Sequence, residues 1–277
     1  MKFDLRQSLR AKYEIENPFW DLVRFYASLG KKKTRQKEFL SDLAKKEARS
    51  GSLREHLSIS NLIADDLLAY INWRTEYTKE ALTLFRSEEE ALNFCKDENF
   101  SVGVTQTKSK DHHQSSKSLI SAVSNIAMTV CSTTGISLET NPQERCVWLI
   151  NNQLHVSARN LDGAIPGIKD PFIVWEIKEY WGKTSGGSKM SDAVYECHLV
   201  GREIRDYEKK INQKIHHIVF LDGRDQWHAR VSDASRFIDL ESQGLIDHLV
   251  IGKMVEDQWQ RILSEILNQV PRNRTPK

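Results

Sequence analysis

The residue pattern best suited to chemistry lies in the second half of the chain. Asp162 stands before Gly163, and fourteen residues later (176 − 162) Glu176-Ile177-Lys178 interrupts an apolar run. In a β-strand, residues two apart point to the same face, so Glu176 and Lys178 are predicted to project together, with Ile177 on the other side. A carboxylate and an ammonium group on a central strand are costly to bury unless the site uses them.

Two carboxylates and a lysine are side-chain types that fit metal-dependent phosphodiester hydrolysis. Mg²⁺ takes oxygen ligands, commonly one or two carboxylates together with waters and a substrate phosphate. The metal lowers the pKa of a bound water and stabilises charge on the phosphate. A lysine beside it can orient or help to deprotonate the attacking water and can neutralise the transition state. If the segments that carry Asp162 and Glu176 pair as a hairpin, the two carboxylates come close together.

This arrangement resembles the PD-(D/E)xK nuclease superfamily, and within it the type II restriction endonucleases. The resemblance covers about residues 115–225 and rests on Asp162, on Glu176-Ile177-Lys178, and on the predicted helix, three strands, helix and strand around them. It implies that Asp162 and Glu176 bind Mg²⁺, with Mn²⁺ able to substitute, and that Lys178 is the catalytic lysine. It also implies cleavage of double-stranded DNA by a homodimer. Leu161 departs from the family pattern, because it stands where the name-giving proline would be.

Several further residues are candidates for DNA contacts or accessory roles. The glycine-rich segment after Tyr180 lacks the order of a nucleotide-binding loop, so no nucleotide cofactor is expected. Its hydroxyl and ammonium groups, and an arginine after the next apolar strand, suit phosphate contacts. The DNA-contact candidates are Lys183, Thr184, Ser188, Lys189 and Arg224. In the superfamily the following helix often contributes a polar residue to the site, which makes Glu196 and Tyr195 accessory candidates.

Three alternatives stay open at this point. Glu176, Lys178 and Glu179 could form the solvated face of an edge strand, where such charges are common. The chain could be another PD-(D/E)xK nuclease, in DNA repair or anti-phage defence. It could also be a non-catalytic DNA-binding module of the same fold. Of His216-His217, at the start of an apolar strand, at most one can face any site.

The elements that must position these residues follow from hydrophobic periodicity in the second half of the chain. Their order indicates an α/β fold, a restriction-endonuclease-like mixed sheet flanked by helices. Helices are expected over residues 119–130, 189–210, from 232 onward and over 256–270, and strands over residues 145–150, 153–157, 171–180, 215–221 and 245–251.

The first part of the chain reads as helical, with helical spacing over residues 19–29, 34–49 and 60–85. Ser87-Glu88-Glu89-Glu90 has the pattern of a capping box that starts a further helix. A polar stretch over residues 101–118 reads as a linker. We therefore expect a helical region over residues 1–110, serving dimerisation or DNA recognition, and a nuclease core over residues 115–277.

Composition sets broad limits on the class of protein. The chain is 39% hydrophobic and 28% charged, and it has no apolar run near the roughly 20 residues of a membrane span. Its four cysteines are far apart and lack C-x-x-C pairing, which argues against a zinc site or a disulfide framework. The net charge of +2 is too small to require nucleic acid as a partner, since clustered charge matters more than the total. We expect a cytoplasmic protein.

Overall fold

The computed structural model describes residues 2–29, 33–45, 61–104, 115–182 and 187–269. The chain divides into two compact units. The first comprises Met1–Glu80 with Ala234–Gly244, and the second comprises Ala81–Asp233 with Leu245–Lys277. No helix among the described residues is long and apolar enough to cross a membrane. The four cysteines all lie in described residues, and each is a buried free thiol.

The first unit is helical, as the sequence predicts. Its helices are α1 (Lys2–Lys12), α2 (Pro18–Ser28), α3 (Lys33–Ala44), most of α5 (Asn61–Leu82) and most of α10 (Val231–Gln243). Helix α2 begins at Pro18 because the Asn17 side chain accepts a hydrogen bond from the Phe19 N–H at 2.9 Å and proline fits the first helical position. Aromatic side chains of α2 and α5, among them Trp20 and Tyr70, pack edge to face in the core of this unit.

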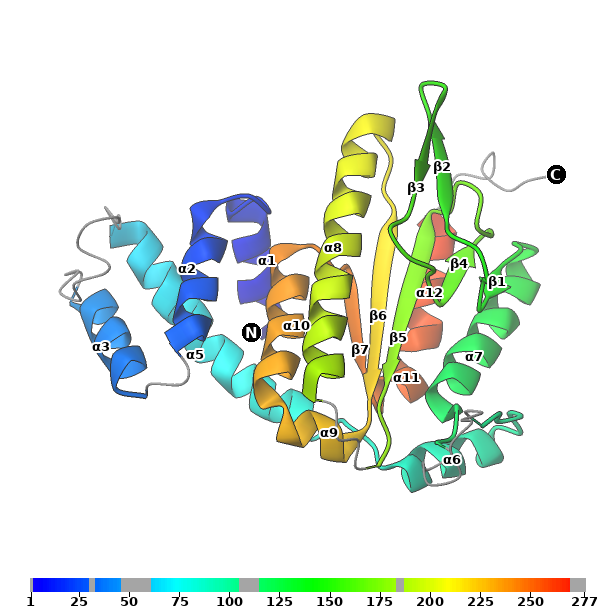
Figure 1. Ribbon diagram of the computed structural model, residues 1–277, viewed down its shortest axis with the longest axis horizontal. Helices are drawn as coiled ribbons and strands as arrows, with labels where there is room; N and C mark the ends of the chain where they lie inside the picture. Colours follow the sequence, from blue (N-terminus) through cyan, green and yellow to red (C-terminus); the bar gives the residue numbers. More distant parts are fainter. Residues whose placement is uncertain (1, 30–32, 46–60, 105–114, 183–186, 270–277) are drawn as a thin grey trace. The chain divides into compact units, whose positions relative to one another are not determined.

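The second unit is built on a mixed five-stranded sheet (Figure 1). Its strands are β1 (Glu139–Thr140), β4 (Gly163–Ile165), β5 (Ile173–Glu179), β6 (His216–Asp222) and β7 (His248–Ile251). The spatial order is β1-β4-β5-β6-β7, so β5 is the central strand. Strand β4 is antiparallel to β1 and β5, whereas β5, β6 and β7 run parallel. This confirms the expected α/β class with a mixed sheet.

Helices cover both faces of this sheet (Figure 1). Trp175 of β5 packs in one apolar cluster with residues of α7 (Ser118–Thr134) and α12 (Trp259–Gln269). Its neighbour Val174 packs in a second cluster with residues of α8 (Gly187–Ile211). Because adjacent residues of a strand point to opposite faces, every second residue of β5 faces α8, and Glu176 and Lys178 are in that set.

The remaining elements are short. They are α6 (Glu88–Asp97), β2 (Val147–Ile150), β3 (Gln153–Val156), α9 (Arg224–Ala229) and α11 (Met254–Asp257). The capping box at the start of α6 is confirmed, because Ser87 and Glu90 exchange both side-chain to backbone hydrogen bonds.

The second expected strand does not pair with β5. Residues 153–156 form β3, which pairs only with β2 in a separate two-stranded hairpin. Asn151 and Asn152, at the turn, both have positive φ (50° and 61°), the backbone conformation that closes a tight two-residue hairpin. The antiparallel partner of β5 is instead β4, a three-residue strand that the periodicity does not predict.

The division into units falls at residues 80/81 rather than near residue 110. The reason is that Ala91 and Cys95 of α6 belong to the same apolar core as α7 and α12. Most of the polar stretch predicted as a linker, residues 105–114, lies outside the described residues.

Candidate active site

The pairing of β4 with β5 brings Asp162 to the position beside Glu176. Gly163 pairs with Trp175, and the Asp162 N–H donates to the Trp175 carbonyl at 3.0 Å. The Asp162 carboxylate Oδ2 accepts from the Ile177 N–H at 2.6 Å. Gly163 is required at this crossing, because a Cβ there would meet the Trp175 ring at 1.9 Å. Asp162 therefore lies directly before the first residue of β4, the strand that pairs with β5.

Glu176 and Lys178 form a buried ion pair on the central strand. Their residues are only 1% and 5% exposed, and the Lys178 Nζ lies 2.9 Å from the Glu176 Oε2. The pair lies on one face of β5, while the intervening Ile177 packs against the apolar cluster on the other face. The alternative of a solvated edge strand is therefore wrong, because the strand is central and both side chains are covered.

Two more charged residues complete this group. The Lys178 Nζ also lies 2.9 Å from the Glu196 Oε2 of α8. Arg159, in the loop between β3 and β4, approaches the Glu176 Oε2 at 3.2 Å and pairs with Glu196. We call Arg159, Glu176, Lys178 and Glu196 the charge cluster. Sequence reasoning missed Arg159, although its position three residues before Asp162 was a usable signal.

Burial and neighbouring charges oppose each other in setting the pKa values of the cluster. Burial disfavours ionisation of Glu176, but Lys178, His217 and Arg159 together hold its pKa well below the usual range. Burial likewise disfavours the charged form of Lys178, yet Glu176 raises the pKa of that amine. For Asp162 burial prevails over the Ile177 N–H, so its pKa is raised. At neutral pH Glu176 is therefore ionised and Lys178 protonated.

One histidine of the pair in β6 faces this group. His217 is fully buried, and its Nδ1 lies 3.0 Å from the Leu245 carbonyl oxygen. Its Nε2 is 3.4 Å from the Glu176 Oε1, with a geometry that makes no hydrogen bond. Neither the Nε2 nor the Oε1 has a hydrogen-bond partner among the described residues. The Glu176 Oε1 is thus an enclosed carboxylate oxygen that lies close to His217 and has no hydrogen bond among the described residues.

The donor set fits a hard cation better than a soft one. Among the described residues no group of three or more His, Cys, Asp and Glu side chains is placed to hold a metal ion. Asp162 and the unsatisfied Oε1 of Glu176 offer two carboxylates, which suits Mg²⁺ because that ion keeps several waters. A structural zinc site, which needs about four protein ligands, does not fit.

Comparison with known proteins gives a family but no activity. Residues 76–266, more than half of the chain, match a family described as "Domain of unknown function (DUF7687)". The chain belongs to this family. The DUF7687 match contains the whole five-stranded sheet, Asp162 and the charge cluster. No curated protein and no solved structure matches the chain.

The remaining candidate residues of the DUF7687 domain, outside the charge cluster, differ in how far the structure describes them and in their exposure. Lys183 and Thr184 lie outside the described residues, and of Ser188 only the helical backbone is described. Lys189 is exposed in the first turn of α8. Tyr195 is 60% exposed on α8, so Glu196, and not its neighbour Tyr195, is the α8 side chain that meets Lys178.

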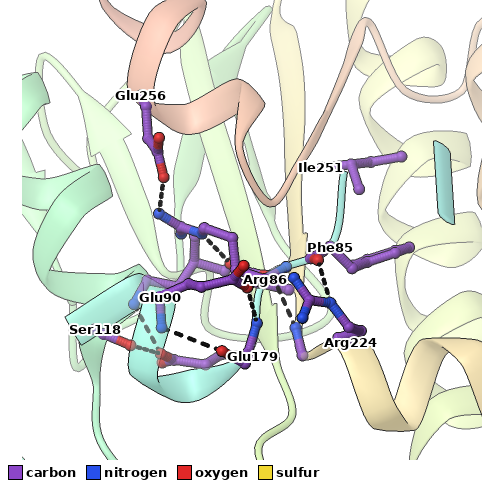
Figure 2. Close-up of polar contacts among 12 residues, drawn as sticks. Phe85, Arg86, Glu90, Ser118, Glu179, Arg224, Ile251 and Glu256 are labelled. Carbon is purple, nitrogen blue, oxygen red and sulfur yellow. Dashed lines mark hydrogen bonds and ion pairs between the residues drawn. The ribbon is translucent and has the colours of Figure 1, made fainter. Parts of the chain in front are cut away.

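Arg224 is held by internal contacts of the DUF7687 domain. Figure 2 shows its guanidinium between α6 and the end of β6. The Arg224 Nε donates to the Phe85 carbonyl at 3.0 Å, and the side chain pairs with Glu90. These contacts indicate that Arg224 joins α6 to the end of β6. Because its guanidinium is engaged in them, Arg224 is a weaker candidate for a DNA contact.

Glu179 lies on the opposite face of β5 from the charge cluster, near the start of α7 (Figure 2). Its Oε1 accepts hydrogen bonds from the Leu119 N–H at 2.7 Å, the Trp181 Nε1 at 2.7 Å and the Ser118 hydroxyl at 3.2 Å. Burial is the largest cause that raises its pKa, to about 7. Glu179 therefore has a structural role at the helix start of the DUF7687 domain, apart from the candidate site.

Proposed function

We propose that this chain is a Mg²⁺-dependent endonuclease that hydrolyses DNA phosphodiester bonds, with a restriction-endonuclease-like core. The single observation that carries the proposal is the buried Glu176–Lys178 pair on the central strand beside Asp162. Burying such a pair costs several kcal/mol of desolvation per ion before the ions attract each other, so a purely structural role is expensive. An antiparallel β4–β5 pair followed by α8 and the parallel strand β6 agrees with the element order that the resemblance implies.

In this proposal Asp162 and Glu176 hold Mg²⁺ or Mn²⁺, which would supply an activated water and neutralise charge on the phosphate. Lys178, held next to Glu176, would orient the attacking water or help to deprotonate it, and would neutralise charge on the phosphate. Glu196 holds Lys178 from the side of α8.

Double-stranded DNA is the proposed substrate, and a homodimer is the proposed active form. A closed twofold dimer presents two copies of the site to the two strands of a palindromic duplex. A second candidate, a DNA-repair or anti-phage nuclease of the same superfamily, would use the same chemistry.

A cleavage assay tests the proposal. Mixed-sequence plasmid and linear duplex DNA are incubated with the protein in Mg²⁺, Mn²⁺, Ca²⁺ or excess chelator. We expect cutting with the first two ions, little with Ca²⁺ because its looser and longer coordination places the water poorly, and none with chelator. Discrete fragments indicate a sequence-specific enzyme and a smear a nonspecific nuclease. Intact DNA under every condition contradicts the proposal.

Substitutions in the same assay assign the residues. Asp162→Asn, Glu176→Gln and Lys178→Met keep the side-chain size while removing the charge, and each should lower cleavage by about a hundredfold or more. Asp206→Asn is the matched control, because Asp206 is an exposed acid further along α8. Normal cutting by all three site variants would locate the catalytic site elsewhere.

A further inference from the structure

The charge cluster has a buried layer and a solvent-facing layer. The side chains of Glu176 and Lys178 are 1% and 6% exposed, whereas those of Arg159 and Glu196 are 33% and 43% exposed. Each of the two cations contacts both of the two acids. A molecule that arrives from solvent therefore meets the Arg159–Glu196 pair before it meets the buried pair.

The loop that carries Arg159 is fixed by its own contacts. The Ser157 hydroxyl donates to the Arg159 carbonyl at 2.8 Å, and the Ala158 N–H donates to the Glu203 Oε2 of α8 at 3.0 Å. These contacts fix the position of the Arg159 guanidinium at the edge of the charge cluster. Its two partners differ, because Glu176 is enclosed and Glu196 can be replaced by a ligand without exposing the core.

We propose that Arg159 is the substrate-phosphate-binding residue of this site, and that Glu196 occupies its guanidinium until a phosphodiester replaces it. This inference rests on the proposed function. Arg159 stays charged at every accessible pH, and the guanidinium fork suits bidentate contact with phosphate oxygens. Exchange of Glu196 for phosphate keeps Arg159 paired throughout, so no half-buried cation is left without a counter-charge.

Because the charge cluster is balanced, substitutions of Arg159 and Glu196 are predicted to change DNA affinity in opposite directions. Two acids and two cations leave the charge cluster neutral. Neutralising Glu196 makes the cluster net positive and frees Arg159, which favours a polyanion. Neutralising Arg159 makes the cluster net negative and removes the phosphate contact.

Equilibrium binding of a labelled duplex, measured by fluorescence anisotropy over a range of NaCl concentrations in Ca²⁺, tests this. Arg159→Gln should weaken binding about tenfold and reduce the slope of log K against log salt by about one, since one phosphate contact is lost. Arg159→Lys should keep the wild-type slope, because it keeps the positive charge. Its affinity should lie between those of wild type and Arg159→Gln, because lysine lacks the bidentate guanidinium. Glu196→Gln should bind several-fold more tightly than wild type.

Arg261→Gln is the matched control, because Arg261 is an exposed arginine on α12, on the other face of the sheet from α8. It should leave affinity and slope unchanged. Wild-type affinity and slope in Arg159→Gln would overturn the inference, as would a Glu196→Gln variant that binds no more tightly. Lost cleavage with unchanged binding by Arg159→Gln would also overturn it, because Arg159 would then serve only to position Glu176.

The two proposals fail in different ways. If wild type binds and cuts DNA but the Arg159 variants bind like it, only the role of Arg159 is wrong. If wild type neither binds duplex nor cuts it under any metal condition, the proposed function is wrong and this inference falls with it.

Discussion

At the scale of single residues, Glu176 and Lys178 determine each other's charge. Each side chain is almost fully covered, and each would be a poor occupant of the core without the other. The pair is therefore sensitive to the loss of one partner and tolerant of the loss of both. This asymmetry distinguishes a real buried pair from two charges that merely lie close together.

Lys178→Met should lower the free energy of unfolding by about 3 kcal/mol, because it leaves the Glu176 carboxylate buried with only part of its counter-charge. The double variant Glu176→Gln/Lys178→Met should regain most of that loss. Urea unfolding of wild type, both single variants and the double variant measures the coupling. Strictly additive losses would show that the two side chains do not stabilise each other.

Glu179 differs from Glu176 although both are buried acids of the same strand. Glu176 has cations beside it, and its pKa is lowered. Glu179 accepts hydrogen bonds from three donors and has no ion-pair partner among the described contacts. Burial raises the pKa of Glu179 to about 7. The folded state thus holds Glu179 as a neutral acid below about pH 7.

This predicts a specific pH dependence of stability. Between pH 4.5, the ordinary value, and about 7, the unfolded chain has lost the Glu179 proton while the folded chain keeps it. The stabilisation is therefore complete below pH 4.5 and is lost as pH rises through 7, by up to about 3 kcal/mol. The free energy of unfolding, measured in urea, should decrease less from pH 5 to pH 8 for Glu179→Gln than for wild type. Glutamine keeps the acceptor oxygen but does not titrate. Equal decreases would contradict the assignment.

At the scale of elements, a mostly buried ion pair joins α5 to α10 within the first unit. The Arg74 guanidinium makes two contacts with the Asp239 carboxylate, at 2.5 Å and 2.7 Å, and the Tyr70 hydroxyl donates to the same carboxylate at 2.8 Å. Asp239 thus joins α10 to α5. Arg74 and Asp239 are 165 residues apart in the sequence. A bidentate, mostly buried pair of this kind is stronger than an exposed ion pair.

Asp239→Ala should lower the free energy of unfolding by about 3 to 5 kcal/mol, because the Arg74 cation stays buried without its partner. Lys79→Ala is the control, since its pair with Glu76 is exposed and should contribute less than about 1 kcal/mol. Chemical unfolding followed by circular dichroism compares the two variants. A loss below 1 kcal/mol for Asp239→Ala would mean that the two helices are held mainly by apolar contacts.

At the scale of the whole molecule, the chain passes between its two units more than once. It leaves the first unit within α5, returns to it within α10, and leaves again after Gly244. Because α5 and α10 continue from one unit into the other, neither unit is a simple fragment of the sequence. Substitutions and whole-chain measurements are therefore better probes of this protein than truncations.

The proposed twofold action predicts an assembly of two chains. Sedimentation velocity should give a particle with roughly twice the 32.0 kDa chain mass, plus the mass of the duplex where DNA and Ca²⁺ are present. The control is the same protein with single-stranded DNA, which offers no twofold site. Chains that stay monomeric under both conditions would remove the dimer from the proposal and leave the nuclease chemistry to be judged by the cleavage assay.

The sequence alone determined the features that depend on local patterns. Alternation along residues 171–180 predicts that Glu176 and Lys178 share a face, and the structure brings them together. Helical periodicity predicts α7, α8 and α12 to within a few residues at most ends, and the S-x-x-E pattern predicts the start of α6. Each of these follows from steric and hydrogen-bond rules that act over a few residues of chain.

Only the tertiary structure decided which segments meet. Strand β4 is three residues long and too short for a periodic signal, and its existence depends on pairing with β5 on one side and β1 on the other. Arg159 joins Glu176 and Glu196, and His217 reaches Glu176, across sequence separations that no local rule constrains. Glu179 has the same residue type as Glu176 and lies on the same strand, but it is a helix-start acceptor because α7 packs on its face of the sheet. Residue type fixes which contacts a side chain can make, and long-range packing decides which of them it does make.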